Sequence, residues 1–312
     1  MLDVKRLRVL REVAAHGSFS AAAEALAYTQ SAVSQQIAAL EREAGTVLVD
    51  RNARGVKLTD AGEALVRHAD AILARLADAE AELEAIAGLR GGRLRLVTFP
   101  SAGATLAPRA VAAFRERHPA VDITLIPGEP DYGIAALRGG ETDIALLIES
   151  GFETCHDPAI ERTRIMDDPM YALLPAGHPL AARRRLRLDD LREDSWIMGP
   201  PVTTCPDSEI LLRACQSAGF EPRIAFNSDD YLAIQGFVAA GMGVSLIPDL
   251  ALLAVRDDVV VRQLRTRAPV RHIVAGTLAG GYCSPAKQAM LEILCEVGRE
   301  FEAKRQTLAL AS

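Results

Sequence analysis

Apolar residues recur with helical spacing between residues 29 and 41. Val33, Ile37 and Leu40 lie at positions i, i+4 and i+7, so this pattern predicts an amphipathic helix with one buried stripe. Thr29 is the expected N-cap. The opposite stripe carries polar side chains that can hydrogen-bond base edges and phosphates, namely Gln30, Ser31, Ser34 and Gln35.

The neighbouring segments extend this pattern to a helix-turn-helix with a wing. A shorter helix is expected just upstream with Ser20 as its cap, and its alanines let two helices cross closely. Residues 7–14 predict a preceding helix that Gly17 ends, and residues 47–58 predict two short strands around a polar turn. Without these neighbours, the pattern of residues 29–41 also fits an ordinary surface helix.

The order and spacing of these segments resemble the N-terminal domain of LysR-type transcriptional regulators. This resemblance implies a winged helix-turn-helix DNA-binding domain over residues 1–58, in a regulator rather than an enzyme. The sequence departs from the family at Val49-Asp50, where Phe usually comes first, which is a change of packing. The resemblance rests on Gly17-Ser18-Phe19-Ser20, residues 29–37, Leu40-Glu41, Arg51, Arg54-Gly55 and residues 58–62.

The net charge of −6 is unfavourable for a DNA-binding protein, but the charge is uneven along the chain. In the first sixty residues the basic residues roughly balance the acids, and DNA affinity depends on local cations. Because the polar face of residues 29–41 has no Lys or Arg, phosphate contacts are expected from the wing and the first helix. The expected DNA-binding residues are Ser20, Thr29, Gln30, Ser31, Ser34, Gln35, Arg51 and Arg54.

Residues 59–87 predict one long helix with an uninterrupted heptad pattern. At about 1.5 Å per residue it is roughly 45 Å long, with too much apolar surface to be stable alone. We therefore expect residues 59–89 to form a linker that makes a homodimer or homotetramer. The alternative is that the apolar stripe packs against its own domain. The expected dimerisation residues are Leu65, Ile72, Leu76, Leu83 and Ile86.

Beyond Gly92 the pattern changes to alternating strands and helices, which predicts a doubly wound α/β sheet. A closing helix is expected over residues 285–304. Strands are expected at residues 94–99, 121–126, 143–148, 170–174, 195–198, 223–226, 243–247, 259–264 and 270–277.

Residues 90–312 resemble the effector-binding domain of the same family, which has the type II periplasmic-binding-protein fold. That resemblance implies two α/β subdomains, with crossings near Met166 and Ala268. Subdomain one is expected over residues 93–165 plus 269–304, and subdomain two over residues 166–268. The matching segments are residues 93–96, 143–146, 174–181 and 239–248.

Two segments are placed to bind a ligand, because ligands of open α/β sheets lie at the carboxyl ends of strands. Residues 100–105 and 198–205 offer hydroxyls and N–H donors, which suit a carboxylate or another small anion. The alternative is that these side chains only cap helices. Asp229-Asp230 can bind an amine, but we favour an N-cap there. The expected effector-binding residues are Ser101, Ala102, Gly103, Thr105, Thr203 and Thr204.

Cysteine usage predicts a reducing, cytoplasmic environment, because the five cysteines are odd in number and lack metal-ligand spacing. Peroxide-sensing members of the family use two cysteines in a segment similar to that of Cys205 and Cys215. We favour a structural role for Cys215, as a small apolar residue on a helix. The sequence shows no signal peptide, membrane span, phosphate-binding loop or nucleophile elbow, so we expect no cofactor, no metal and no membrane contact.

The sequence therefore predicts an effector-responsive transcriptional regulator that binds a double-stranded DNA operator as a dimer or tetramer. The alternative is a cytosolic binding protein or enzyme of periplasmic-binding-protein fold, whose N-terminal domain serves only assembly. Catalytic groups spaced in the cleft would favour that alternative, and the sequence contains none that we recognise.

Overall fold

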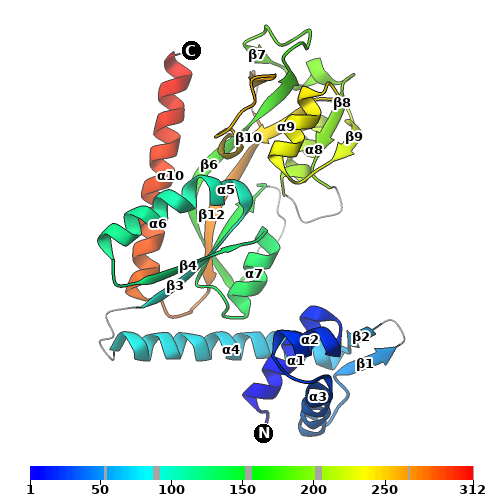
Figure 1. Ribbon diagram of the computed structural model, residues 1–312, viewed down its shortest axis with the longest axis vertical. Helices are drawn as coiled ribbons and strands as arrows, with labels where there is room; N and C mark the ends of the chain where they lie inside the picture. The colour runs from blue at the N-terminus through cyan, green and yellow to red at the C-terminus, as the bar shows by residue number, and fades with distance from the viewer. Residues whose placement is uncertain (53–54, 87–91, 152–156, 201–205, 266–267, 312) are drawn as a thin grey trace. The chain divides into compact units, whose positions relative to one another are not determined.

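The computed structural model describes residues 1–312 except 53–54, 87–91, 152–156, 201–205, 266–267 and 312. Residues 51, 52, 55, 77, 78, 81, 82, 84–86 and 306–311 are described by their backbone alone. The chain divides into two compact units, one built mainly on residues 1–86 and the other mainly on residues from 92 onward. Each unit is described separately (Figure 1).

The first unit begins with the three expected helices. Gly17 ends the first of them in a left-handed conformation (φ 58°), and the Thr29 side chain caps the third by accepting from the N–H of Ala32 at 3.2 Å. The cap of the second is Ser18 rather than Ser20, because the helix already begins at the buried Phe19. These helices are α1 (Val4–His16), α2 (Phe19–Ala25) and α3 (Gln30–Ala44).

The buried stripe of α3 forms the core of this unit together with α1. Val33, Ile37 and Leu40 have no exposed surface and pack with Leu10 and Val13 of α1. Burying these side chains fixes the orientation of α3, so its polar stripe faces outward. The turn that leads into α3 contains Ala27 at φ 53°, a left-handed conformation that costs an alanine about 1–2 kcal/mol.

The wing is a two-stranded antiparallel sheet of β1 (Val49–Asn52) and β2 (Gly55–Leu58). The Glu41 carboxylate accepts from the N–H of Leu48 at 2.9 Å, which ties α3 to the start of the wing. The long helix α4 (Asp60–Ile86) follows. A Cβ on Gly62 would lie 2.1 Å from the Leu48 carbonyl oxygen, so only glycine permits this close approach of α4 to the wing.

The second unit is a mixed α/β structure in two parts, which we call lobe one and lobe two (Figure 1). In lobe one, β3 pairs in parallel with β4 and β5, and β12 pairs antiparallel with β5. Its core contains Leu96 of β3, Ile144 of β5, Phe114 of α6 and Ile293 of α10. The elements are β3 (Arg93–Thr98), α5 (Pro100–Ala104), α6 (Leu106–Arg117), β4 (Asp122–Pro127), α7 (Pro130–Arg138), β5 (Ile144–Glu149), β12 (Val270–Leu278) and α10 (Pro285–Ala311).

Lobe two has its own core around Trp196, which is fully buried and packs near Cys215 and Leu246. Its parallel pair β8–β9 adjoins β10 through a bridge between Trp196 and Val244. The elements are β7 (Arg185–Leu186), η1 (Leu188–Leu191), β8 (Ser195–Met198), α8 (Pro206–Ser217), β9 (Arg223–Asn227), α9 (Tyr231–Ala239), β10 (Ser245–Pro248), η2 (Asp249–Ala251) and β11 (Val259–Leu264).

One strand, β6 (Ile160–Pro175), belongs to both lobes. It pairs with β12 as far as Pro169 and with β10 from Met170. The sequence predicted only its second half, because residues 160–169 are rich in charged side chains and lack a clear apolar alternation. The two lobes are therefore joined by a continuous strand, with β12 beside it (Figure 1).

Candidate nucleic-acid interface and ligand cavity

The polar stripe of α3 is accessible, as the sequence predicts. Gln30, Ser31 and Gln35 are exposed and Ser34 is half-buried, and the Thr29 and Ser31 hydroxyls lie 3.0 Å apart at the start of the helix. Ser20 is exposed on α2. The N-terminal end of a helix also carries a partial positive charge, which favours a phosphate.

Two adjacent glutamines of α3 differ in their surroundings. Gln36 accepts a hydrogen bond from Nε of Arg6 at 3.2 Å, and Arg6 also forms an ion pair with Glu43. Gln36 therefore ties α3 to α1, whereas the neighbouring Gln35 is exposed. The sequence analysis did not identify this role of Gln36, because a polar residue beside a buried stripe has no pattern of its own.

The predicted phosphate contacts lie at the wing. Arg51 is on β1, opposite Val56 of β2, and its side chain is outside the described set. Arg54 lies outside the described residues altogether. Their contacts with phosphates remain predictions.

Helix α4 presents part of the predicted apolar stripe. Ile72, Leu76 and Leu83 are 42%, 47% and 66% exposed, and their spacing places them along one face. Leu65 differs, because it packs partly against the core of its own unit. The side chain of Ile86 is outside the described set.

A cavity of about 190 Å³ lies in the second unit, between residues of the two lobes. Lobe one contributes the segment after β3, and lobe two contributes the starts of α8 and α9. Both apolar and charged side chains line it. The wall consists of Phe99, Pro100, Ser101, Glu129, Ile148, Pro200, Asp207, Asp229, Tyr231 and Arg271.

The buried guanidinium of Arg271 organises this cavity. Its Nε lies 2.7 Å from Oδ2 of Asp168, its Nη1 lies 3.1 Å from Oδ2 of Asp207, and its Nη2 donates to Oγ of Ser101 at 2.6 Å. Arg271 and Asp168 are 1% and 0% exposed. Burial alone would lower the pKa of Arg271, but Asp207 and Asp168 outweigh that effect and raise it, so the guanidinium stays charged.

Every other charged side chain among the described residues of the wall is a carboxylate. Burial raises the pKa of Glu129, and the nearby Asp207 and Asp229 raise it further against the opposing effect of Arg271. Tyr231 donates its hydroxyl to Asp207. The cavity thus holds more negative than positive charge, in contrast to the anion-binding character that the sequence suggested.

The structure brings only one of the predicted effector-binding residues to the cavity wall. Ser101 lies there, whereas Ala102 is fully buried in the apolar core. The N–H of Gly103 bonds to the Phe99 carbonyl, and the Thr105 hydroxyl bonds to the Ser101 carbonyl at 2.6 Å. These two residues stabilise the local helical turns. Thr203 and Thr204 lie outside the described residues.

The two aspartates before α9 have separate roles. Asp230 caps the helix by accepting from the N–H of Leu232 at 2.8 Å, as favoured from the sequence. Asp229 instead lines the cavity, so the cap interpretation covers only one of the pair. Sequence reasoning missed Glu129, Asp207 and Arg271, although an arginine within the apolar strand Val270–Leu278 is a signal for a buried ion pair.

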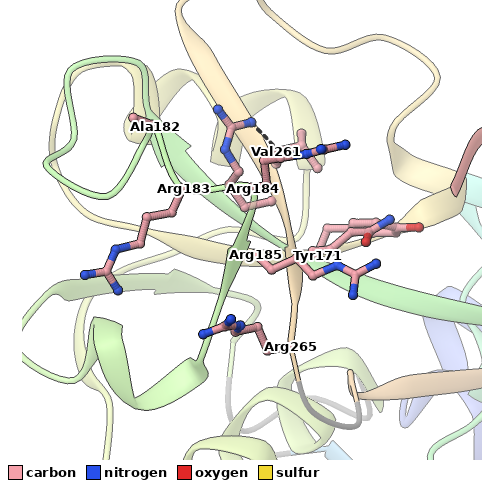
Figure 2. A pocket seen from close by; sticks show the side chains of 9 residues that line it. Tyr171, Ala182, Arg183, Arg184, Arg185, Val261 and Arg265 are labelled. Carbon is pink, nitrogen blue, oxygen red and sulfur yellow. Dashed lines mark hydrogen bonds between the residues drawn. The ribbon is translucent and has the colours of Figure 1, made fainter. Parts of the chain in front are cut away.

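A second concavity, the arginine groove, lies on the surface of lobe two and measures about 1050 Å³ (Figure 2). Arg185 of β7 is in register with Gln263 of β11, and Arg265 comes directly after β11 ends at Leu264. The guanidinium of Arg262 already makes a hydrogen bond within the protein, because its Nε donates to the Ala181 carbonyl at 2.9 Å. The groove is strongly basic, since its arginines are Arg183, Arg184, Arg185, Arg262 and Arg265.

The cysteines support the structural interpretation. Cys215 is fully buried, and burial raises its pKa to about 12, while Cys205 lies outside the described residues. Within the described part of the chain, no group of three or more His, Cys, Asp or Glu side chains is arranged to hold a metal ion. No helix in that part is both long and apolar enough to cross a membrane.

Two family models match the chain and together span most of it. The model described as "Bacterial regulatory helix-turn-helix protein, lysR family" matches residues 4–63, and "LysR substrate binding domain" matches residues 87–299. The chain is 31% identical over 304 residues to "Probable HTH-type transcriptional regulator LrrA" of Synechococcus elongatus, covering 97% of this chain and 99% of that protein. It is 32% identical over 250 residues to "Transcriptional dual regulator GltC" of Bacillus subtilis, covering 80% and 81%.

Solved structures share the fold over nearly the whole length. A full-length OxyR variant from Pseudomonas aeruginosa has a TM-score of 0.68 at 24% identity, covering 96% of this chain and 95% of that one. Full-length CbnR in complex with its target DNA has a TM-score of 0.62 at 22% identity, covering 95% and 100%.

Proposed function

The chain belongs to the LysR family of bacterial transcriptional regulators, and we propose that effector binding in the cavity between its two lobes controls its binding to DNA. The single observation that carries the DNA-binding half is the exposed polar face of α3, held outward by a buried apolar stripe. The relatives are named as transcriptional regulators, and we propose regulation rather than catalysis as the role of this chain.

In the proposed complex α3 enters the major groove. Gln30, Ser31, Ser34 and Gln35 then face base edges, and glutamine amides pair well with adenine. Ser20 and Thr29 are proposed to contact the backbone, together with the wing arginines. This assignment divides the interface into residues that read sequence and residues that supply affinity.

We propose that α4 forms a dimer through Ile72, Leu76 and Leu83. Exposed apolar side chains in one stripe on a long helix favour burial against a second copy. Two recognition helices then engage two half-sites of an inverted repeat. In this arrangement residues 1–58 bind DNA, residues 59–89 link the subunits, and residues 90–312 bind the effector.

The effector is proposed to act through Arg271, which contacts groups from both lobes. Its partners include Ser101 on α5 of lobe one and Asp207 on α8 of lobe two. A ligand that changes these contacts alters the relative geometry of the lobes. A change within the effector domain can in this way change how two DNA-binding domains are presented.

The test is a gel shift of the full-length protein on DNA flanking its own gene, at several salt concentrations. A specific complex that resists competitor DNA, and whose affinity falls as salt rises, is the expected result. Equal affinity for flanking and random DNA would contradict sequence-specific binding. Gln35→Ala should lose the difference in affinity between flanking and random DNA. Gln36→Ala is its matched control and should keep that difference.

A further inference from the structure

We propose that the effector is a small organic cation whose ammonium or guanidinium group binds among Glu129, Asp207 and Asp229, with its apolar part on lobe two. This inference rests on the proposed function, because it assigns a chemical class to the ligand of the same cavity. It replaces the anionic ligand that the sequence suggested.

The first argument is that the cation in the cavity wall is already engaged. Arg271 is the only Lys, Arg or His among the described residues that line the cavity. Its guanidinium contacts Asp168, Asp207 and Ser101 at 2.6–3.1 Å, and its Nη1 also lies 3.4 Å from the Tyr231 hydroxyl. A carboxylate ligand that displaced Asp168 or Asp207 from Arg271 would leave that carboxylate without its counter-ion, which is costly.

The second argument is the excess of negative charge. Arg271 pairs with both Asp168 and Asp207, so these two carboxylates already exceed its single positive charge. Glu129 and Asp229 add two further carboxylates around a cavity of only about 190 Å³. Burial raises the pKa of Glu129 most, and the nearby Asp207 and Asp229 raise it further, as expected of neighbouring carboxylates, which repel one another. A cation relieves this repulsion, whereas an anion increases it.

The third argument is the shape and chemistry of the adjoining space. A neighbouring cavity of about 490 Å³ is also lined by Ser101, Glu129 and Asp229, and it continues over Leu232 and Leu253. These leucines are 63% and 67% exposed, so apolar surface lies next to the acidic group. A ligand with a charged head and a short hydrocarbon part fits both regions.

The test measures thermal unfolding and calorimetric binding of the full-length protein with amine and carboxylate probes of similar size. The amines are putrescine, agmatine and benzylamine, and the carboxylates are succinate and benzoate. At least one amine is expected to raise the melting temperature in a concentration-dependent way. Glu129→Gln and Asp229→Asn should each lower the affinity for that amine about tenfold, because each removes a charge-assisted contact. Asp122→Asn is the control and should change nothing, because it removes an exposed carboxylate of β4 that lines neither cavity.

A second readout needs no ligand. If the carboxylates repel one another, Glu129→Gln combined with Asp229→Asn should raise the melting temperature of the ligand-free protein, and Asp122→Asn should not. The proposal is overturned if no amine binds, or if this double variant is less stable than wild type. It is also overturned if only carboxylates bind and that binding survives Arg184→Ala and Arg185→Ala, which would place an anion in the cavity rather than in the arginine groove. The gel shift measures DNA binding and not the class of ligand. Neither result here therefore decides the test of the proposed function.

Discussion

Arg271 donates from Nη2 to the hydroxyl of Ser101 at 2.6 Å, although 170 residues separate the two along the chain. Ser101 lies on α5 in lobe one, and Arg271 lies on β12, which runs beside β6 from one lobe toward the other. The same guanidinium contacts Asp207 of lobe two. This contact therefore joins the two lobes at the wall of the proposed effector site.

Replacing Gln35 with alanine should reduce discrimination between operator and random DNA. The exposed amide is proposed to read a base edge, so specific binding should weaken by about 1–3 kcal/mol while non-specific binding changes little. Competition gel shifts measure both affinities. Gln36→Ala, which removes the contact with Arg6 instead, should retain the discrimination. An equal loss on both DNAs for Gln35→Ala would exclude base reading.

Removing either wing arginine should weaken binding to every DNA sequence. Arg51→Ala or Arg54→Ala should each lower the slope of log affinity against log salt by about one, because one phosphate contact releases about one counter-ion. The control is Arg117→Ala, which removes the same charge from an arginine that pairs with Glu296 in the second unit. An unchanged slope in both wing variants would show that these arginines do not contact phosphates.

Ile72→Asp should prevent dimerisation. Ile72 is 42% exposed on the apolar stripe of α4, and an aspartate there would have to be desolvated in a dimer interface. The variant should sediment as a monomer and lose operator binding, because two half-sites are no longer engaged together. Ala71→Asp introduces the same charge one position off the stripe, at an exposed residue, and should remain dimeric. A dimeric Ile72→Asp protein with wild-type DNA affinity would place the interface elsewhere.

Arg271→Met should destabilise the effector domain by about 3–5 kcal/mol, because it leaves the buried carboxylate of Asp168 without a counter-ion. Adding Asp168→Asn should restore part of that loss, since an amide oxygen can still accept from the N–H of Leu250. Urea unfolding can be followed through Trp196, the only tryptophan of the chain. Arg256→Met, at an exposed pair with Asp258, is the control and should unfold near the wild-type midpoint. Destabilisation of similar size in both variants would contradict this account.

Cys215 should resist alkylation in the folded protein at pH 8. Burial raises its pKa to about 12, so only about one thiol in ten thousand is ionised at that pH, and the thiolate is the reactive species. Exposed Cys283 in the same chain serves as the internal control and should be labelled. Peptide mapping by mass spectrometry distinguishes the two sites. Labelling of both at similar rates would support the alternative of a reactive, redox-sensing Cys215.

The helices of the first unit were predictable because each pattern is local. The buried stripe Val33, Ile37 and Leu40 and the cap at Thr29 are spaced by the helix itself, so the structure confirms them. The displaced cap at Ser18 shows the limit of such patterns. Either serine can cap a helix, and the burial of Phe19 decided which one does.

The ligand cavity was not predictable in the same way. From the sequence, hydroxyl-containing loops after strands favoured an anion, and Ser101 does reach the wall. Its partner Arg271 comes from a distant strand, and Glu129, Asp207 and Asp229 come from three further segments. No local pattern links residues that far apart, so the charge of the cavity emerges only when the strands pair.

By itself, the sequence determined the class of fold, the order of its elements and the face of α3 that is exposed, because periodic burial is encoded within each element. Only the tertiary structure decided that β6 continues through both lobes, and that Arg271 is shared between Ser101 and two aspartates. The reason is physical. The free energy of a buried charge depends on every group within a few ångströms, and those groups are brought together by folding rather than by neighbouring positions in the chain.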